Sequence, residues 1–403
     1  MHIVGFTLAF VAALGVVAST IFLLMTILGA FKFFREAARQ KRFAESLTED
    51  QLPFVSLLKP MHGLEPQLEE NFESFFLVDY PRYEVIFACD HEDDPAIAVA
   101  ERVRTRYPQI PSKIVVNGEP PWPNRQNFAL YSAAQVATSD YLVTSDSDVI
   151  VTRNYLREVV PPMLDSKTGS LTCVYRGLAT GGFWSLMDAI GMSVEMTAGV
   201  LVANLVEGMK FALSPTLVLN RKAHESIGGY TATGYYFSHD FVIGNRIAKN
   251  GYNVVLSRHI ISHVVPPMHF KKMWQHLVRW AAGTRRSRPA GHLGTGLIFS
   301  VPYGILALIA GCLLGHPGIG AAVLGWSIAN RMIESLLVGW GITRDPACLY
   351  RPWLYPIRDL IGFAVWVASY VSTDLAWRER NFELTSDGRI QVHGGQPGSA
   401  ATR

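Results

Sequence analysis

The hydrophobic and polar positions divide the chain into two long apolar blocks and a polar middle. No charged residue occurs between Ile3 and Phe31. About 20 apolar residues in a helix cross a hydrocarbon core of about 30 Å, so this run predicts a retained membrane anchor over residues 1–34. A second apolar block, residues 293–377, is rich in Gly, Ala and Ser and predicts two or three further membrane helices. Between them lies a polar domain, residues 35–292, and residues 378–403 form a polar tail.

The polar middle alternates short β-forming runs with helical patterns. The predicted elements, in chain order, are a strand at 52–58, a helix at 65–76, strands at 83–89 and 113–116 around a helix at 96–107, and a helix at 128–138 before a strand at 141–144. Such alternation predicts an α/β fold with a mostly parallel sheet and flanking helices. In open sheets of this kind the ligand binds at the carboxyl ends of the strands.

Composition and charge placement indicate where this domain lies. Of the 403 residues, 49% are hydrophobic and only 17% are charged, which is too apolar for an ordinary soluble enzyme. Basic residues cluster at 32–42 and 271–288, beside the apolar blocks, so the polar domain is expected on the cytoplasmic side. Arg378 and Arg380 also favour the cytoplasm, whereas three full crossings would place them outside, so one apolar segment is expected to be re-entrant or interfacial. The net charge of +3 favours a bilayer surface over nucleic acid as partner.

Two aspartates spaced i, i+2 follow the last of these strands. Asp146 and Asp148 come directly after the apolar run that begins at Tyr141. Side chains at i and i+2 of an extended segment project to the same side, so both carboxylates can share one divalent cation. Mg²⁺ or Mn²⁺ is held by one or two carboxylates and completed by substrate phosphates, as a nucleotide-sugar transferase needs for a departing diphosphate. Aspartates at strand ends are also common in turns, and that interpretation stays open.

A second acidic cluster follows the strand at 83–89. Asp90 lies at the carboxyl end of the strand and is expected to hold the uracil or ribose of a nucleotide. The other acidic residues of the cluster are equally consistent with a helix start, in which Asp93 or Asp94 caps a helix that begins at Pro95.

Later motifs supply candidates for acid–base chemistry and diphosphate binding. Asp240, preceded by His239, lies in the first turn of an amphipathic helix and is a candidate general base; the alternative is simple charge complementarity with the helix dipole. His276, Arg279 and Trp280 lie on a later helix, where they are expected to clamp the diphosphate and to wall the acceptor pocket. The alternative for this helix is a basic membrane-flanking segment with an interfacial Trp.

Two apolar segments carry charges that need partners. Residues 182–213 are interrupted by Asp188, Glu195 and Glu207, so they are expected to form an interfacial wall that admits a lipid hydroxyl, or else a plain pair of core helices. Within the second apolar block, Arg331 and Glu334 are spaced i, i+3 and are expected to pair.

Taken in order, Asp90, Asp146-x-Asp148, His239-Asp240 and His276-x-x-Arg279-Trp280, followed by membrane spans, resemble the ceramide glucosyltransferase family of the GT-A inverting glycosyltransferases. The resemblance covers about residues 1–390. The supporting phrases are Val55 to Gly63, Asp79-Tyr-Pro, Asp93 to Ile97, Ser145 to Val149, Leu205 to Leu213 and Ile227 to Tyr230. It implies a GT-A fold and transfer of a hexose from a UDP-sugar, UDP-glucose first among them, to the hydroxyl of a membrane lipid such as ceramide. A bacterial branch is similar and glycosylates hopanoid polyols, with UDP-N-acetylglucosamine as the alternative donor.

The chain departs from the family pattern at three places. His239 stands where an acidic residue is usual, and His276 stands where Gln or Arg is usual. Where relatives often carry Asn-x-Lys, this chain has Asn124 followed by Arg125, so these two residues are assigned to the nucleotide site, with Arg125 in place of the Lys. The two histidines predict a rate that changes with pH near neutrality.

The mechanism that the resemblance implies is a single inverting displacement. Asp148, with Asp146, holds Mg²⁺ or Mn²⁺ on the UDP diphosphate, Asp240 takes the acceptor proton, and Arg279 adds positive charge to the departing diphosphate. Two alternatives stay open. A polysaccharide synthase shares the Asp and Arg-Trp motifs but normally needs more spans, and a membrane scaffold with a decayed transferase domain would explain the departures.

Overall fold

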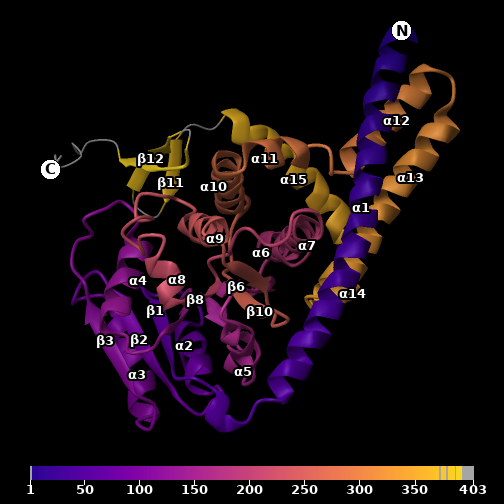
Figure 1. Cartoon of the computed structure of the whole chain (residues 1–403). Helices are drawn as coiled ribbons and strands as arrows, with labels where there is room; N and C mark the ends of the chain where they lie inside the picture. The colour runs from indigo at the N-terminus through magenta and orange to yellow at the C-terminus, as the bar shows by residue number, and fades with distance from the viewer. Residues whose placement is uncertain (1, 372–373, 378–379, 386, 393–403) are drawn as a thin grey trace.

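The computed structural model describes residues 2–371, 374–377, 380–385 and 387–392. Figure 1 shows an α/β domain beside a group of long helices, with the N-terminus at the far end of those helices. The predicted fold class, a mostly parallel sheet with apolar helices near both ends of the chain, is confirmed.

The α/β domain is built on a seven-stranded sheet in the order β3-β2-β1-β4-β8-β6-β9. Its strands are β1 (Val55–Pro60), β2 (Tyr83–Cys89), β3 (Ser112–Val116), β4 (Tyr141–Ser145), β6 (Thr168–Thr172), β8 (Thr216–Asn220) and β9 (Asn253–Leu256). The first four strands are mutually parallel, and β8 runs antiparallel to both of its neighbours. Because β1, β2 and β4 are parallel, their carboxyl ends meet at one edge of the sheet.

Alternate residues of the central strands face opposite sides of the sheet, and each side has its own core. Leu57 and Phe87 join one buried cluster, whereas Leu58 and Ile86 join the other. Helices cover both faces. They are α2 (Leu68–Phe76), α3 (Pro95–Arg106), α4 (Arg125–Val136), α5 (Tyr155–Val159), α8 (Arg221–Glu225) and α9 (His239–Lys249), with short 3₁₀ turns at Glu49–Gln51 and Pro161–Leu164.

A smaller sheet lies next to the carboxyl end of β4. It contains β5 (Val149–Ile150), β7 (Tyr175–Ala179) and β10 (Ile261–Val265), with β10 in the centre. The N–H of Val264 in β10 donates to the carbonyl of Asp148 at 2.7 Å, so this sheet anchors the segment that follows β4.

Residues 183–206 form one helix that is interrupted by a π-helical turn. Its parts are α6 (Phe183–Ile190), the π-helix η3 (Gly191–Met196) and α7 (Thr197–Val206). By length and composition it is apolar enough to cross a membrane, yet 61% of its most apolar 18-residue stretch is buried inside the protein. It packs on β7 and on the long N-terminal helix. The interfacial role expected for residues 182–213 stays a prediction.

The remaining helices connect the domain with the apolar blocks. They are α1 (His2–Glu45), α10 (Phe270–Ser287), α11 (Pro289–Thr295), α12 (Val301–Leu313), α13 (Pro317–Glu334), the π-helix η4 (Ser335–Trp340), α14 (Pro346–Tyr350) and α15 (Leu354–Val371). Of the described helices, α1, the helix at 183–206 and the continuous α13–η4 are long and apolar enough to cross a membrane. With 13 residues, α12 reaches only about 20 Å. Figure 1 shows α12 and α13 beside the N-terminal half of α1.

Charges within the apolar helices pair with one another. Arg331 Nη1 lies 2.7 Å from Glu334 Oε2, which confirms the predicted i, i+3 pair, and 3.6 Å from Asp359 Oδ1 on α15. On α15 as well, Arg358 Nη1 lies 3.0 Å from Glu195 Oε2 in the π-helical turn η3. These ion pairs bind α15 to α13 on one side and to the helix at 183–206 on the other.

The boundaries expected near the C-terminus are wrong. Membrane helix was expected up to residue 377, but α15 ends at Val371 and is followed by an antiparallel sheet of β11 (Asp374–Trp377), β12 (Arg380–Leu384) and β13 (Ile390–Val392). Polar residues recur through this segment, which removes the long apolar face that a membrane helix requires. Residue 378 and residues 393–403 lie outside the described part of the chain.

The small C-terminal sheet contacts the α/β domain. Ile390 N–H donates to the carbonyl of Tyr235 at 2.8 Å, and Phe237 N–H donates to the carbonyl of Gly388 at 3.1 Å. The described part of this segment therefore packs against the α/β domain. Within the described residues, α15 packs against α10, α12 and α13, and the re-entrant or interfacial segment expected from the sequence stays a prediction.

Candidate active site

Asp146 is the first residue after β4 and lies among polar side chains from three other segments. Its Oδ1 accepts from Gln126 Nε2 at 2.6 Å and lies 3.4 Å from Ser214 Oγ. Burial, together with the nearby negative charge of Asp148, raises the pKa of Asp146 to about 7. The two carboxylates therefore lie close enough for the charge of one to act on the other.

Asp148 has an oxygen that is free for a ligand. Its Oδ1 is buried without a hydrogen-bond partner in the described part of the chain, while Oδ2 lies 3.4 Å from His263 Nε2. Two repelling carboxylates with an orphaned oxygen fit a hard divalent cation. Within the residues that the structure describes, no group of three or more His, Cys, Asp or Glu side chains could hold a metal ion by itself. A cation at this pair would therefore take its other ligands from substrate phosphate or water.

Lys59 is a site residue that the sequence patterns did not single out. It occupies β1 beside β4, is completely buried, and donates from Nζ to the carbonyl of Asp146. Its ammonium lies 3.8 Å from the centre of the Phe75 ring. Burial lowers the pKa of Lys59 to about 7 although Asp146, Asp148 and Glu65 favour its charged form. The available signal was a lysine inside an otherwise apolar buried strand, which needs a partner.

Asp240 belongs to the same site through Ser214. Asp240 Oδ2 accepts from the backbone N–H of Ser214 at 2.7 Å, and the hydroxyl of Ser214 contacts Asp146. The structure thus places Asp146 and Asp240 on either side of Ser214, with Asp148 near Asp146, and the catalytic and metal-binding roles assigned to these residues stay predictions. Burial also raises the pKa of Tyr175, and Asp240, Asp146 and Asp148 each add to the rise, which places that ring beside all three carboxylates.

His239, next to Asp240, lies inside the protein instead of lining the open site. Its Nδ1 is 3.2 Å from Asn124 Nδ2, and burial lowers the pKa of the imidazole. Asn124 caps α4 by accepting from Asn127 N–H at 2.9 Å, and its amide donates to the carbonyl of Tyr236. Both side chains therefore hold the loop before α9 against the start of α4. Their direct roles, catalytic for His239 and nucleotide-binding for Asn124, stay predictions.

Asp90 and Arg125 lie together at the carboxyl end of β2. Arg125 Nη1 donates to Asp90 Oδ2 at 2.7 Å, and Asn117 Nδ2 donates to Asp90 Oδ1 at 3.1 Å. Asp94, in contrast, caps α3 by accepting from Ala96 N–H at 2.8 Å. The acidic cluster thus divides as expected into one strand-end carboxylate and one helix cap, and the nucleotide role of the Asp90–Arg125 pair stays a prediction.

His276 faces a buried carboxylate whose role the sequence did not reveal. Its Nδ1 lies 3.3 Å from Asp188 Oδ2, and its ring packs edge-on against Trp280 with centroids 4.5 Å apart. Asp188 is 1% exposed, and neither of its oxygens has a hydrogen-bond partner in the region the structure describes. It is also among the carboxylates that raise the pKa of Tyr175. The pair therefore adjoins the aspartate site, and half-buried Arg279 lies on the same helix.

Comparison with known proteins identifies the family. A model of glycosyl transferase family 21 matches residues 8–390. The chain belongs to this family. Ceramide glucosyltransferase 1 of Caenorhabditis elegans is 22% identical over 346 residues, covering 85% of this chain and 74% of the relative. Ceramide glucosyltransferase 3 of the same organism is 23% identical, covering 87% and 77%.

A solved structure shows the same fold. A mannosyltransferase from Pyrobaculum calidifontis, in complex with GDP-Man and Mn²⁺, aligns over 90% of this family 21 chain and 98% of its own, with a TM-score of 0.50 and 19% identity. The family match and these relatives establish that the chain is a glycosyltransferase with a GT-A type domain.

Proposed function

We propose that this family 21 protein transfers glucose from UDP-glucose to the hydroxyl of a membrane lipid such as ceramide. The observation that carries the proposal is that Ser214 contacts both Asp146 and Asp240 at the carboxyl end of β4, with Asp148 near Asp146. The curated relatives are named as ceramide glucosyltransferases, which supports the lipid acceptor and the glucosyl donor.

Asp240 is the residue we assign as general base in a single inverting displacement. The N–H of Ser214 holds Oδ2 of Asp240, which orients the carboxylate toward the space it shares with Asp146. As the acceptor oxygen attacks the anomeric carbon, Asp240 takes its proton, and the bond from that carbon to the diphosphate breaks. A positioned base of this kind contributes about 10²- to 10⁴-fold to the rate.

Asp148 and Asp146 are the residues we assign to hold Mg²⁺ or Mn²⁺. When bound, the ion supplies positive charge to the diphosphate leaving group. Lys59 stabilises this pair, because its buried ammonium offsets part of the repulsion between the two carboxylates. Arg279, His276 and Trp280 are assigned to the far side of the diphosphate and to the wall of the acceptor pocket.

The nucleotide is assigned to the neighbouring strand end. Asp90 and Arg125 form an ion pair at the end of β2, next to β1 in the same sheet, where a uridine would lie if its diphosphate reached Asp148. Asn124 contributes to this site by capping α4, the helix from which Arg125 projects.

We assign the catalytic domain to the cytoplasmic side of the membrane. The basic residues at 32–42 follow the apolar part of α1, and those at 271–288 precede the apolar block that begins at residue 293; positive flanks of this kind stay in the cytoplasm. The helix at 183–206 connects the site with the membrane helices, because Asp188 faces His276 while Glu195 pairs with Arg358. The partners we assign to this protein are accordingly a UDP-sugar and a lipid within the bilayer, and not a nucleic acid.

The test is glycosyl transfer by the purified full chain in detergent. With labelled UDP-glucose, ceramide and Mn²⁺, label should appear in a lipid product, and EDTA should abolish the transfer until excess Mn²⁺ is restored. Label in hopanoid polyols from UDP-N-acetylglucosamine, or in a long polymer, would replace the proposed acceptor.

A variant in the site tests the base assignment directly. Asp240→Asn should lower kcat about 10²- to 10⁴-fold with the fold intact. Asp165→Asn, which changes an aspartate in the turn before β6 rather than in the site, is the matched control and should keep the original rate. Transfer near the original rate by Asp240→Asn would refute the assignment.

A further inference from the structure

A cavity of about 230 Å³ lies outside the aspartate site, between α1 and the segments beside η4. Its lining includes Phe33, Phe34, Lys41, Arg258, Ile260 and Arg344. The first three belong to α1, Arg258 and Ile260 precede β10, and Arg344 follows η4. Apolar side chains therefore meet three cations where the membrane anchor joins the catalytic domain.

The cations of this cavity have donors to spare. Arg258 Nη2 lies 3.0 Å from Glu158 Oε1, but its Nε is buried with no hydrogen-bond partner among the described residues. The guanidinium of Arg344 lies over the Trp340 ring at 5.6 Å from its centre. Lys41 is exposed, and its Nζ lies 3.7 Å from Glu45 Oε1. The wall thus presents more positive charge than its own carboxylates neutralise.

Arg344 is also held in an unusual backbone conformation. Its φ is 57°, in the left-handed region that costs a residue other than glycine free energy. The carbonyl of Arg344 accepts from Arg176 Nη1 at 3.1 Å, which fixes the turn. The surrounding structure therefore fixes the backbone from which this exposed side chain reaches the cavity.

The surroundings of the cavity have the composition of a membrane interface. Tyr350 and Trp353 are 71% and 55% exposed on the segment that follows Arg344, and Phe34 is 46% exposed on α1. Exposed aromatic rings of this kind collect at the level of the lipid headgroups. On α1 the charge-free run ends just before Lys32, within one helical turn of Phe34 and of the cavity.

We propose that this cavity binds the headgroup of an anionic phospholipid from the cytoplasmic leaflet. The phosphodiester would take the spare donors of Arg258, Arg344 and Lys41, and the acyl chains would follow Phe33 and Phe34 toward the bilayer. A volume of about 230 Å³ is many times the roughly 10–15 Å³ that one water needs on the same measure, so the cavity has room for a group larger than a water. Such a lipid would hold the base of α1 against the catalytic domain.

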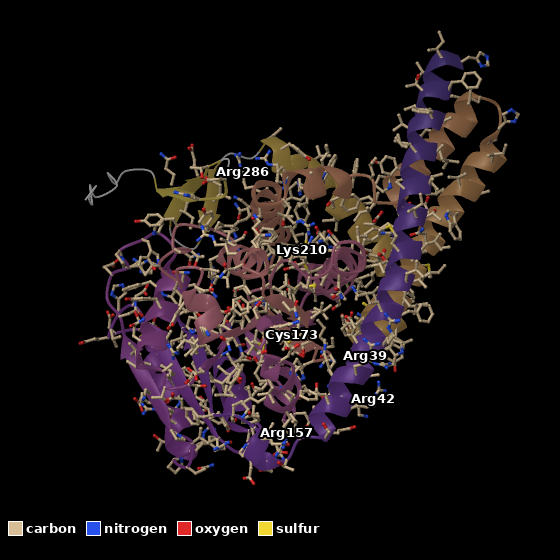
Figure 2. All side chains as sticks on the ribbon, viewed as in Figure 1. Arg39, Arg42, Arg157, Cys173, Lys210 and Arg286 are labelled. Carbon is tan, nitrogen blue, oxygen red and sulfur yellow. The ribbon has the colours of Figure 1, made fainter. Side chains whose placement is uncertain are left out.

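The experiment uses the full chain in a non-ionic detergent with dioleoyl-phosphatidylglycerol added as probe. Native mass spectrometry reports the fraction of protein that retains one lipid. The test variant is Lys41→Gln/Arg344→Gln. The control is Arg39→Gln/Arg42→Gln, which removes the same amount of charge from two exposed positions of α1 that do not line the cavity (Figure 2). Removing two lipid-facing cations should weaken binding about 30-fold, whereas the control should change it less than about threefold.

Separate arms distinguish a lipid from a free anion and binding from misfolding. Dioleoyl-phosphatidylcholine and inorganic phosphate at the same concentrations should neither be retained nor displace the phosphatidylglycerol. If the test variant has a lower unfolding temperature than the control, exposed Lys41→Gln alone is used and should weaken binding about fivefold. Equal losses in test and control variants, equal retention of phosphatidylcholine, or displacement by phosphate would each overturn the proposal.

Discussion

Replacing Asp188 by Asn tests whether this buried carboxylate acts through His276. Asp188 is 1% exposed and its Oδ2 lies 3.3 Å from His276 Nδ1, so the imidazole lies against a buried carboxylate inside the protein. A hydrogen bond that His276 forms to this carboxylate as the substrate binds would contribute about 1.5–3 kcal/mol. If that energy keeps His276 positioned for the transition state, Asp188→Asn should lower kcat about 10- to 150-fold.

The assay is a double-mutant cycle on lipid glucosylation. The rate constants kcat and KM are measured for the original chain, Asp188→Asn, His276→Gln and the double variant. The effect of Asp188→Asn should largely disappear once His276 is Gln, with a coupling energy of at least about 1 kcal/mol. Glu207→Gln, at the end of the same long helix, changes a half-exposed carboxylate that pairs with Arg288, and it should leave kcat within about twofold.

Two results would refute this reasoning. The same fold loss in both backgrounds would mean that Asp188 stabilises the helix rather than positions His276. A normal kcat with a lower unfolding temperature would likewise restrict Asp188 to a structural role. A double-mutant cycle separates these cases, because the effect of Asp188→Asn on kcat disappears in the His276→Gln background only if the two side chains interact.

Three further predictions concern stability. Burial lowers the pKa of His224 to about 4, so the stability that this histidine contributes is fully present above about pH 6.5 and falls by about 3 kcal/mol toward pH 4. The difference in unfolding free energy between the original chain and His224→Gln should shrink by that amount as the pH falls. Parallel stability curves for the two proteins would contradict this prediction. Arg331→Met leaves Glu334 buried without its closest cation and should cost about 3–5 kcal/mol in detergent denaturation, with at least half recovered in Arg331→Met/Glu334→Gln; no recovery would argue against the pair. Gly15→Ala places a Cβ 2.1 Å from the Tyr303 ring and should cost at least about 1–3 kcal/mol by forcing α1 from α12, so an unchanged melting temperature would refute this packing.

Local patterns predicted those features whose partners lie close in sequence. The Asp94 cap needs only the residues that follow it, and the Arg331–Glu334 pair needs only the helical repeat. The strands that end at Asp90 and Asp146 were recognisable because apolar β-forming runs stop there. The parallel arrangement of β1, β2 and β4 follows from the helices between them.

The small sheet near the C-terminus shows where such patterns fail. Its strands lie at 374–377, 380–384 and 390–392, within a segment whose first part was expected to be helical and whose remainder was described only as a polar tail. What stabilises it is contact with distant residues, since Ile390 bonds to Tyr235 and Gly388 to Phe237. Intrinsic propensity is a weak guide in short segments of this kind because tertiary partners decide their conformation.

From the sequence alone came the membrane segments, the alternating domain and the identity of three acidic motifs, because each depends on hydrophobicity, periodicity or spacing over a few residues. Only the tertiary structure decided that Lys59 lies beneath Asp146, that Ser214 joins residues 146 and 240, and that Asp188 faces His276. Ser214 is 68 positions from Asp146, and His276 lies on a different helix from Asp188. Contacts over such separations depend on how the sheet and helices pack, because the free energy that forms them comes from burying shared surfaces and not from the local chain.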